Sequence, residues 1–271
     1  MRSSSKTRDK VRQTANAVAI PLGVALNCVP FAYGRSVGVV AREHEPLLAA
    51  AGWTFSIWGV IFMAQIAYAV FQALPKQRRH PVLRRIGWHT ALNGLLGGIW
   101  TVAFTHHEDA AALVTMMALL ANLVLIDIRL GEDANHGAAL WLARVPLGLN
   151  LGWIAAAAIL NVALFLHRDI GWNGSPFDPL VWSLAMVVAA ALLALVMALS
   201  RQNLAFAVAI AWSLAGIADY RRLDTAPLAL TAVILAMGLV VLVIVEGASI
   251  AGARLRMPRI RIDPRTPQPN R

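Results

Sequence analysis

Long apolar runs with almost no charge set the main constraint on this chain. They lie at residues 16–40, 52–74, 86–105, 110–130, 142–166, 180–199, 203–218 and 227–250. A membrane span needs about 20 mostly apolar residues, and in lipid every backbone amide must be bonded internally. The runs also lack the alternation of a barrel strand. We therefore predict an all-helical, multi-pass integral membrane protein with eight transmembrane helices.

Composition and charge agree with this class and predict an orientation. Of the 271 residues 58% are hydrophobic and 14% charged, and the mean hydropathy is +0.62. With eight spans, nineteen of the 24 Lys and Arg residues fall on the side of the N-terminus. Cytoplasmic segments are enriched in these residues, so we expect both termini in the cytoplasm and the protein in the bacterial inner membrane. The net charge of +10 then predicts anionic lipid at the inner face as a partner, rather than nucleic acid.

A change in composition divides the chain. Intramembrane Asn, Gln and His concentrate in the first five runs, whereas Ala, Leu and Val dominate the last three. We expect a basic cytoplasmic N-terminus at 1–15, a five-helix core at 16–166, a three-helix extension at 167–250, and a basic, disordered tail at 251–271. The only cysteine, Cys28, lies in the first run and is expected to be a small buried hydrophobe.

Polar and aromatic side chains share one face on several predicted helices. At 100° per residue, His89, Asn93 and Trp100 fall within about 40° of one another. Broader stripes contain Phe55, Trp58, Phe62 and Gln65; Asn150, Trp153, Ala157 and Asn161; and Gly23, Asn27, Pro30 and Gly34. Such stripes predict either interhelical packing and hydrogen bonding, for which the small-residue segment GLLGG at 94–98 is suited, or a ligand-lined cavity.

Other candidates for chemistry are few. The segment HHED at 106–109 could bind a metal but is more typical of a solvated turn. Asp127 and Glu246 lie near inner helix ends, where we expect snorkelling or pairing with Arg129 or Arg254. Four further tryptophans near helix ends are expected to form an interfacial belt: Trp53, Trp88, Trp141 and Trp172. We expect no metal site, no catalytic group and no obligatory cofactor.

Three segments carry a family resemblance. GWTFSIWGVIFMAQIAY at 52–68 contains the deep tryptophan Trp58, ALNGLLGGIWTVAF at 91–104 contains Asn93, and LNLGWIAAAAILN at 149–161 contains Trp153. In this order they resemble the second, third and fifth helices of the tryptophan-rich sensory protein family, also called the translocator protein or peripheral-type benzodiazepine receptor family. The chain departs from that pattern before the second helix, where LAAAG replaces twin prolines. It departs again at Leu96, where the family has tryptophan, and at Leu149 and Asn150, where it has proline and tyrosine.

The resemblance implies a five-helix bundle whose cavity, near the first loop, binds porphyrins, sterols and drug-like ligands. It implies a ligand-binding or sensory protein that regulates or moves a flat hydrophobic molecule, with a tetrapyrrole as a candidate ligand, and a homodimer. Arg42 and His44 could pair with tetrapyrrole propionates at the outer mouth. The expected ligand-binding residues are Trp58, Asn93, Trp153, Phe55, Phe62, Gln65, Trp100, Asn150, Ala157 and Asn161. A secondary transporter of a small solute and a porphyrin-degrading activity are the alternatives.

Overall fold

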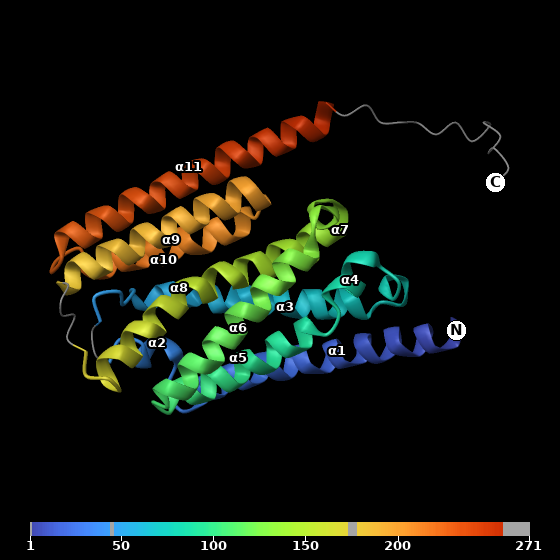
Figure 1. Ribbon diagram of the computed structural model, residues 1–271, viewed down its shortest axis with the longest axis horizontal. Coiled ribbons are helices and arrows are strands. Elements are labelled where there is room, and N and C mark those ends of the chain that lie inside the picture. The colour runs from blue at the N-terminus through green and yellow to red at the C-terminus, as the bar shows by residue number, and fades with distance from the viewer. Residues whose placement is uncertain (1, 44–45, 173–177, 257–271) are drawn as a thin grey trace.

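The computed structural model describes residues 2–43, 46–172 and 178–256, and over these residues the chain is helical without strands (Figure 1). The long helices in this part are α1 (Arg2–Ala32), α3 (Ile57–Ala73), α5 (His89–Thr105), α6 (Asp109–Leu130), α8 (Val145–Arg168), α9 (Pro179–Arg201), α10 (Leu204–Arg221) and α11 (Ala226–Arg256). Because they alternate in direction, α1 begins and α11 ends on the same side of the molecule. The predicted all-helical class is confirmed.

Short elements connect the long helices. They are α2 (Val37–Val40), η1 (Gly52–Ser56), η2 (Pro75–Gln77), α4 (Pro81–Ile86), η3 (Glu132–Asn135), α7 (Gly137–Ala139) and the π-helical turn η4 (Leu140–Arg144). Figure 1 places α4 and α7 at the end where α1 begins, and α2 at the opposite end.

Within the described residues, six helical segments are long and apolar enough to cross a membrane. They are Gly52–Ala73, Asp109–Leu130, Gly137–Arg168, Pro179–Arg201, Leu204–Arg221 and Ala226–Gly252. The chain is therefore a multi-pass integral membrane protein. The other two predicted spans correspond to α1, whose first half is polar, and α5, which has only 17 residues. A total of eight spans stays a prediction, as do the orientation and the named membrane.

The first predicted span, 16–40, has the wrong boundaries at both ends. Its helix begins at Arg2, inside the basic segment, and ends at Ala32. Gly34 then adopts a left-handed backbone with φ 69°, a conformation that glycine allows at little cost. The Ser36 hydroxyl accepts a hydrogen bond from the Val39 N–H and starts α2 separately. The apolar run therefore continues through a turn that hydropathy alone does not reveal.

Small residues bring α1 and α5 into close contact. A Cβ atom at Gly94 would lie 2.7 Å from the Ala19 carbonyl oxygen, and one at Gly98 would lie 2.8 Å from a Leu26 methyl carbon. Only glycine permits this approach of the two helices. The GLLGG segment thus serves packing within one chain, and its buried glycines are not free to form a contact between two copies. The homodimer itself stays a prediction.

The polar first half of α1 packs against the segment around α4. The Arg12 guanidinium donates to the backbone oxygens of Leu83 at 3.3 Å and Arg78 at 3.0 Å. Asp9 forms an ion pair with Arg84. Arg84 Nε also donates a hydrogen bond to Asp9 Oδ1 at 3.0 Å. Hydrogen bonding from Arg84 holds the pKa of the Asp9 carboxyl below its usual value of 3.8. The N-terminal basic segment is therefore part of the folded structure.

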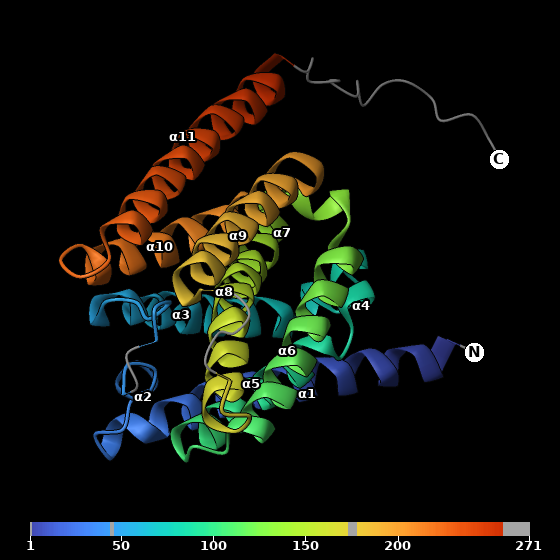
Figure 2. The ribbon, with the colours of Figure 1, turned by 60° about the vertical axis from the view of Figure 1, so that its left-hand side comes forward.

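The helices α9, α10 and α11 form a layer against α8, with α10 packed directly on it (Figures 1 and 2). Gly152 of α8 allows this approach, because a Cβ atom there would lie 2.5 Å from the Phe206 carbonyl oxygen and 2.8 Å from the Ala209 Cβ. The extension and the core therefore share a tight interface.

Helix α10 also holds η1, the segment that leads into α3. The Trp212 indole N–H donates to the Thr54 carbonyl oxygen at 2.8 Å. The Ala51 N–H donates to the Gly216 carbonyl oxygen at 3.0 Å. Thr54 itself is completely buried. The extension consequently supports the start of α3.

The tryptophans expected near helix ends have different surroundings. Trp88 and Trp141 are 43% and 69% exposed, as interfacial residues should be. Trp53 lies edge to face with Trp212 at 4.9 Å and donates to Asp219 at 2.9 Å. Trp53 therefore connects η1 to α10 in addition to any contact with the membrane interface.

Candidate functional site

Three indoles meet in the core of the bundle. The ring centroid of Trp58 in α3 lies 6.1 Å from that of Trp100 in α5 and 6.0 Å from that of Trp153 in α8. Trp58 also stacks on Phe62 at 5.2 Å, and Trp153 contacts Phe55 edge to face at 5.8 Å. These residues form one continuous aromatic cluster, whose flat faces suit contact with a planar apolar group.

A cavity of about 420 Å³, here called the loop cavity, lies on one side of this cluster beside the first loop. It is lined by Cys28, Ser36, Val37, Gly38, Arg42, Gly52, Phe55, Ser56, Trp58, Gly59 and Phe62. Its size falls in the range of small-molecule sites, and apolar walls with a few polar groups are typical of them. The loop cavity is therefore the best-formed candidate for a ligand site in the core.

Arg42 supplies the positive charge of the loop cavity. Its guanidinium carbon lies 6.0 Å from the Phe55 ring centroid. Gly52 leaves room for it, since a Cβ atom there would lie 3.1 Å from the Arg42 Nη1 atom. Among the described residues this buried Nη1 atom has no hydrogen-bond partner. A guanidinium nitrogen in this position is ready to bind an anionic group.

A smaller polar space, here called the amide chamber, lies deeper in the core. It is lined by Asn27, Trp58, Phe62, Gln65, Asn93, Gly94, Gly97, Leu119 and Asn150, and the volume open to the centre of a water molecule is about 10 Å³. That is room for about one water molecule. Trp58 and Phe62 line both spaces, so they form the wall between the loop cavity and the amide chamber.

Several buried polar atoms around the two spaces are unpaired within the described part of the chain. They are the indole nitrogens of Trp58 and Trp153 and the Oδ1 atom of Asn150. The Asn150 amide nitrogen reaches Asn93 Oδ1 only at 3.5 Å, the limit of a hydrogen bond. Buried polar groups are normally satisfied, so orphaned ones at a cavity indicate a missing water or ligand.

The structure brings most of the expected site residues together. Phe55, Trp58 and Phe62 line the loop cavity, and Trp58, Phe62, Gln65, Asn93 and Asn150 line the amide chamber. Trp100 and Trp153 belong to the same cluster because both of their rings contact Trp58. Two residues act differently. Asn161 accepts a hydrogen bond from the Trp100 indole at 3.1 Å and donates one to the Ala157 carbonyl oxygen at 2.9 Å, and it therefore holds the Trp100 ring in place. Ala157 lines neither the loop cavity nor the amide chamber.

Sequence reasoning erred at one position beside the site. Cys28 is exposed rather than buried, because its face of α1 borders the loop cavity instead of a neighbouring helix. The His44 side chain, expected beside Arg42, lies outside the described residues. Nothing in the sequence indicated that Arg42 Nη1 would be buried without a partner among the described residues, because this depends on how the first loop folds back over Phe55.

The HHED segment forms a polar cluster at the end of the bundle that carries the first loop. His107 Nε2 lies 2.6 Å from Arg35 Nη2 and 3.2 Å from a Glu43 carboxylate oxygen, and its Nδ1 lies 2.6 Å from Arg168 Nη2. Arg168 also pairs with Asp109 at 3.0 Å. His107 therefore connects the first loop to α6 and α8. No group of three His, Cys, Asp or Glu side chains suited to a metal occurs among the described residues.

Asp127 is paired differently from the prediction. Its carboxylate accepts from Arg201 Nε at 3.2 Å and from the Asn203 amide at 2.8 Å, and it lies 3.9 Å from Arg144 Nη1. Arg129, the expected partner, is exposed. The real partners come from α9, α10 and η4, which is a tertiary arrangement that spacing along α6 cannot indicate.

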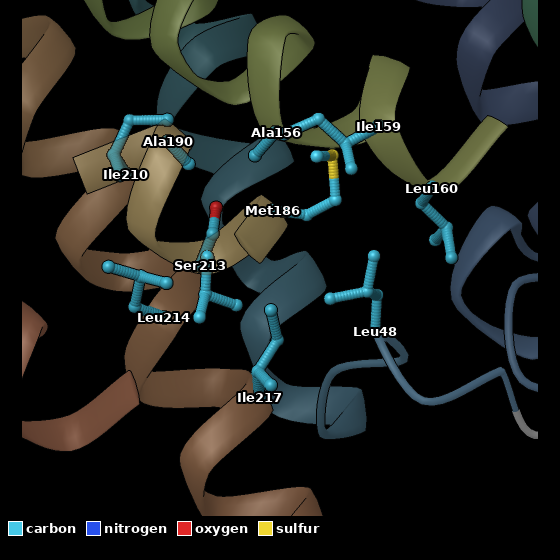
Figure 3. Close-up of a pocket in the computed structure, with 11 residues that line it drawn as sticks. Leu48, Ala156, Ile159, Leu160, Met186, Ala190, Ile210, Ser213, Leu214 and Ile217 are labelled. Atoms are coloured by element: carbon cyan, nitrogen blue, oxygen red, sulfur yellow. The ribbon is translucent and has the colours of Figure 1, made fainter. Parts of the chain in front are cut away.

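A third space lies between the core and the extension. Figure 3 shows the side chains of α8, α9 and α10 that converge on it, with Leu48 at one side. Its volume is only about 40 Å³ and its lining is apolar apart from Ser213. The Ser213 hydroxyl donates to the Ala209 carbonyl oxygen at 2.9 Å. The described lining thus offers no free polar group to orient a ligand, and the space is best described as a packing void.

Comparison with known protein families shows to which family this chain belongs. A family model described as TSPO-like protein matches residues 13–245. The chain belongs to the TSPO-like protein family. The family predicted from the sequence is thereby confirmed. No curated protein and no solved structure matches the chain.

The extent of the match bears on the extension. It runs from α1 into α11, whereas the motifs in the sequence were confined to 16–166. The helices α9, α10 and α11 are therefore covered by the TSPO-like family model together with the core. This agrees with the tight contacts that α10 makes with α8 and η1.

Proposed function

We propose that the protein binds a flat hydrophobic molecule with a carboxylate group, such as a porphyrin, in the loop cavity, and thereby senses or moves it. The observation that carries this proposal is the loop cavity itself, where an indole and phenyl wall faces the unpaired Arg42 nitrogen. The rings provide apolar contact with a planar molecule. The guanidinium provides a charge-assisted bond to a carboxylate.

The amide chamber supports the same proposal from the other side of Trp58. A polar group of the ligand, or a water molecule beneath it, would satisfy Asn150 Oδ1 and the Trp58 indole nitrogen. A few polar groups in an apolar site are what fix the orientation of a ligand. A sterol-like ligand would use the rings and the chamber but would leave Arg42 unpaired, so we favour the acidic ligand.

Binding is tested by quenching of tryptophan fluorescence in detergent, with a dicarboxylic porphyrin and its dimethyl ester as probes. We expect saturable quenching by both, with the acid bound more tightly. Arg42→Gln should weaken binding of the acid roughly 10- to 100-fold, the effect of losing a hydrogen bond to a charged group, and should leave the ester unchanged. The exposed Arg222 provides a matched control as Arg222→Gln. Equal affinity for acid and ester, or no saturable quenching, would refute the proposal.

The two alternatives from the sequence have separate readouts. A secondary transporter predicts counterflow of a solute in proteoliposomes. A porphyrin-degrading activity predicts loss of the porphyrin absorbance under illumination, with product formation abolished by Trp58→Phe and by Trp153→Phe. Stable absorbance together with saturable binding supports a binding or sensory role.

A further inference from the structure

A long apolar groove lies outside the core cavities, between α6 and α9, with α8 as its floor. Its volume is about 730 Å³, the largest among the described spaces. Met117, Val124 and Ile128 of α6 line it and are 46%, 42% and 58% exposed, and Leu193 of α9 is 47% exposed. These exposed apolar residues would face lipid in a membrane. The groove therefore opens sideways toward the acyl chains of the bilayer.

The groove is long enough for one acyl chain. Its lining covers residues 117–128 of α6 and 151–162 of α8, which at a rise of 1.5 Å per residue is about 16 Å on each helix, and it continues along residues 182–201 of α9 for about 28 Å. Half of the hydrocarbon core of a bilayer is about 15 Å. The part of the groove that is enclosed by α6, α8 and α9 together therefore accommodates a single lipid tail from one leaflet.

One end of the groove is charged. Among the described residues, the charged members of its lining are Asp127 and Arg201, and Arg144 nearby is 3% exposed. Arg144 and Arg201 carry two positive charges, and among the described residues they share one carboxylate, that of Asp127. The Nε and Nη1 atoms of Arg144 have no hydrogen-bond partner within the described part of the chain. The cluster is thus one negative charge short of neutrality in a place where unpaired charge is costly.

This end lies on the side of the molecule where α1 begins and α11 ends, because α6 and α9 both run toward it (Figures 1 and 2). By the distribution of Lys and Arg it is the predicted cytoplasmic side, where anionic lipids are concentrated. The apolar groove and the excess positive charge are therefore placed as the tail and the phosphate of a lipid in the inner leaflet would be.

We propose that the groove between α6 and α9 is a specific site for one anionic phospholipid, with an acyl chain along α8 and the phosphate at Arg201. Arg201 is suited to this contact because its side chain is 38% exposed while its Nε atom is anchored on Asp127 at 3.2 Å. Guanidinium groups bind phosphate with strong, directed hydrogen bonds. The site is separate from the loop cavity and does not depend on the function proposed for it.

The proposal is tested by the thermal unfolding of the detergent-purified full chain with added phosphatidylglycerol or phosphatidylcholine. A lipid that binds only the folded state raises the unfolding temperature in a saturable way. We expect a larger rise with phosphatidylglycerol. Arg201→Gln should remove this difference between the two lipids, whereas Arg129→Gln, at an exposed arginine of the same helix as Asp127, should keep it. An equal rise with both lipids in the unaltered protein would overturn the proposal.

A second pair of variants tests the tail. Ala189 lines the groove and is exposed, and Ala185 lies one turn earlier on α9, is also exposed and is not part of the groove lining. Ala189→Phe should abolish the saturable stabilisation by phosphatidylglycerol, and Ala185→Phe should leave it unchanged. Retained stabilisation in Ala189→Phe contradicts the site. Stabilisation by inorganic phosphate alone as large as by phosphatidylglycerol would indicate a free-anion site and also refute the lipid proposal.

Discussion

Two buried polar regions of this protein differ in how their groups are paired. In the amide chamber, Asn150 Oδ1 and the Trp58 indole nitrogen have no partner among the described residues. At Asp127, by contrast, both carboxylate oxygens receive hydrogen bonds or ion pairs from other helices. Polar side chains in a membrane are costly in either place. Those that are fully paired act as joints between helices, and those left unpaired beside a cavity are candidates for ligand contact.

The largest effect is expected at the paired carboxylate of Asp127. Asp127→Ala leaves Arg144 and Arg201 without their carboxylate, and Arg144 is buried. Removing one partner of a buried pair typically lowers the free energy of unfolding by about 3–5 kcal/mol. Unfolding with a denaturing detergent measures the loss. The control is Asp133→Ala, which removes an exposed ion pair with Arg85 and should cost at most about 1 kcal/mol. If Asp127→Ala and Asp133→Ala lowered the free energy of unfolding equally, the buried pairing of Asp127 would be no more important for stability than an exposed ion pair.

A smaller effect is expected at Asn161 and Asn150, two asparagines of α8 whose side chains differ in their hydrogen bonding. Asn161→Leu breaks the 3.1 Å bond to the buried Trp100 indole and should lower the free energy of unfolding by about 1–3 kcal/mol. Asn150→Leu loses only a marginal contact and should cost less than about 1 kcal/mol, while it weakens ligand binding. Paired measurements of unfolding and of porphyrin affinity check this. If Asn150→Leu were the more destabilising of the two, the amide chamber would be a structural joint.

The smallest effect concerns a pair outside the spanning segments. The Arg84 hydrogen bond lowers the pKa of Asp9 below 3.8, so the folded state favours the ionised carboxylate. The resulting stabilisation is complete well above that pH and is lost as the pH falls through the lowered pKa. The unfolding temperatures of the unaltered protein and Asp9→Asn should differ at pH 6 and converge once the pH falls below the lowered pKa of Asp9. A difference that persists at the lowest pH would show that the charge of Asp9 is irrelevant.

Much of the fold follows from the sequence, because it depends on composition along single helices. The apolar runs predicted the six confirmed spanning segments to within a few residues, except for the long segment Gly137–Arg168, whose start was missed by five. The π-helical turn Leu140–Arg144 lies at that start. Arg144 interrupts the apolar pattern there, and its role becomes clear only when Asp127 is placed beside it.

The site was predicted in part for a related reason. A common helix face was enough to place Trp58, Asn93 and Asn150 around shared spaces. Periodicity cannot report the angle at which two helices meet, and therefore missed that Asn161 is used to hold Trp100. It also could not foresee that Arg42 would fold back to the Phe55 ring, since that depends on the loop.

Because α10 is hydrogen-bonded to η1, the helices beyond residue 166 cannot be removed without affecting the core. The Ala51 N–H and the Thr54 carbonyl oxygen both rely on α10, and η1 carries Phe55 and leads directly to Trp58. Substitutions at Trp212 or Gly216, on a helix that lines neither the loop cavity nor the amide chamber, can therefore alter ligand affinity by displacing the aromatic wall. Under the function proposed above, α10 therefore contributes to recognition at the first loop although it lines neither space.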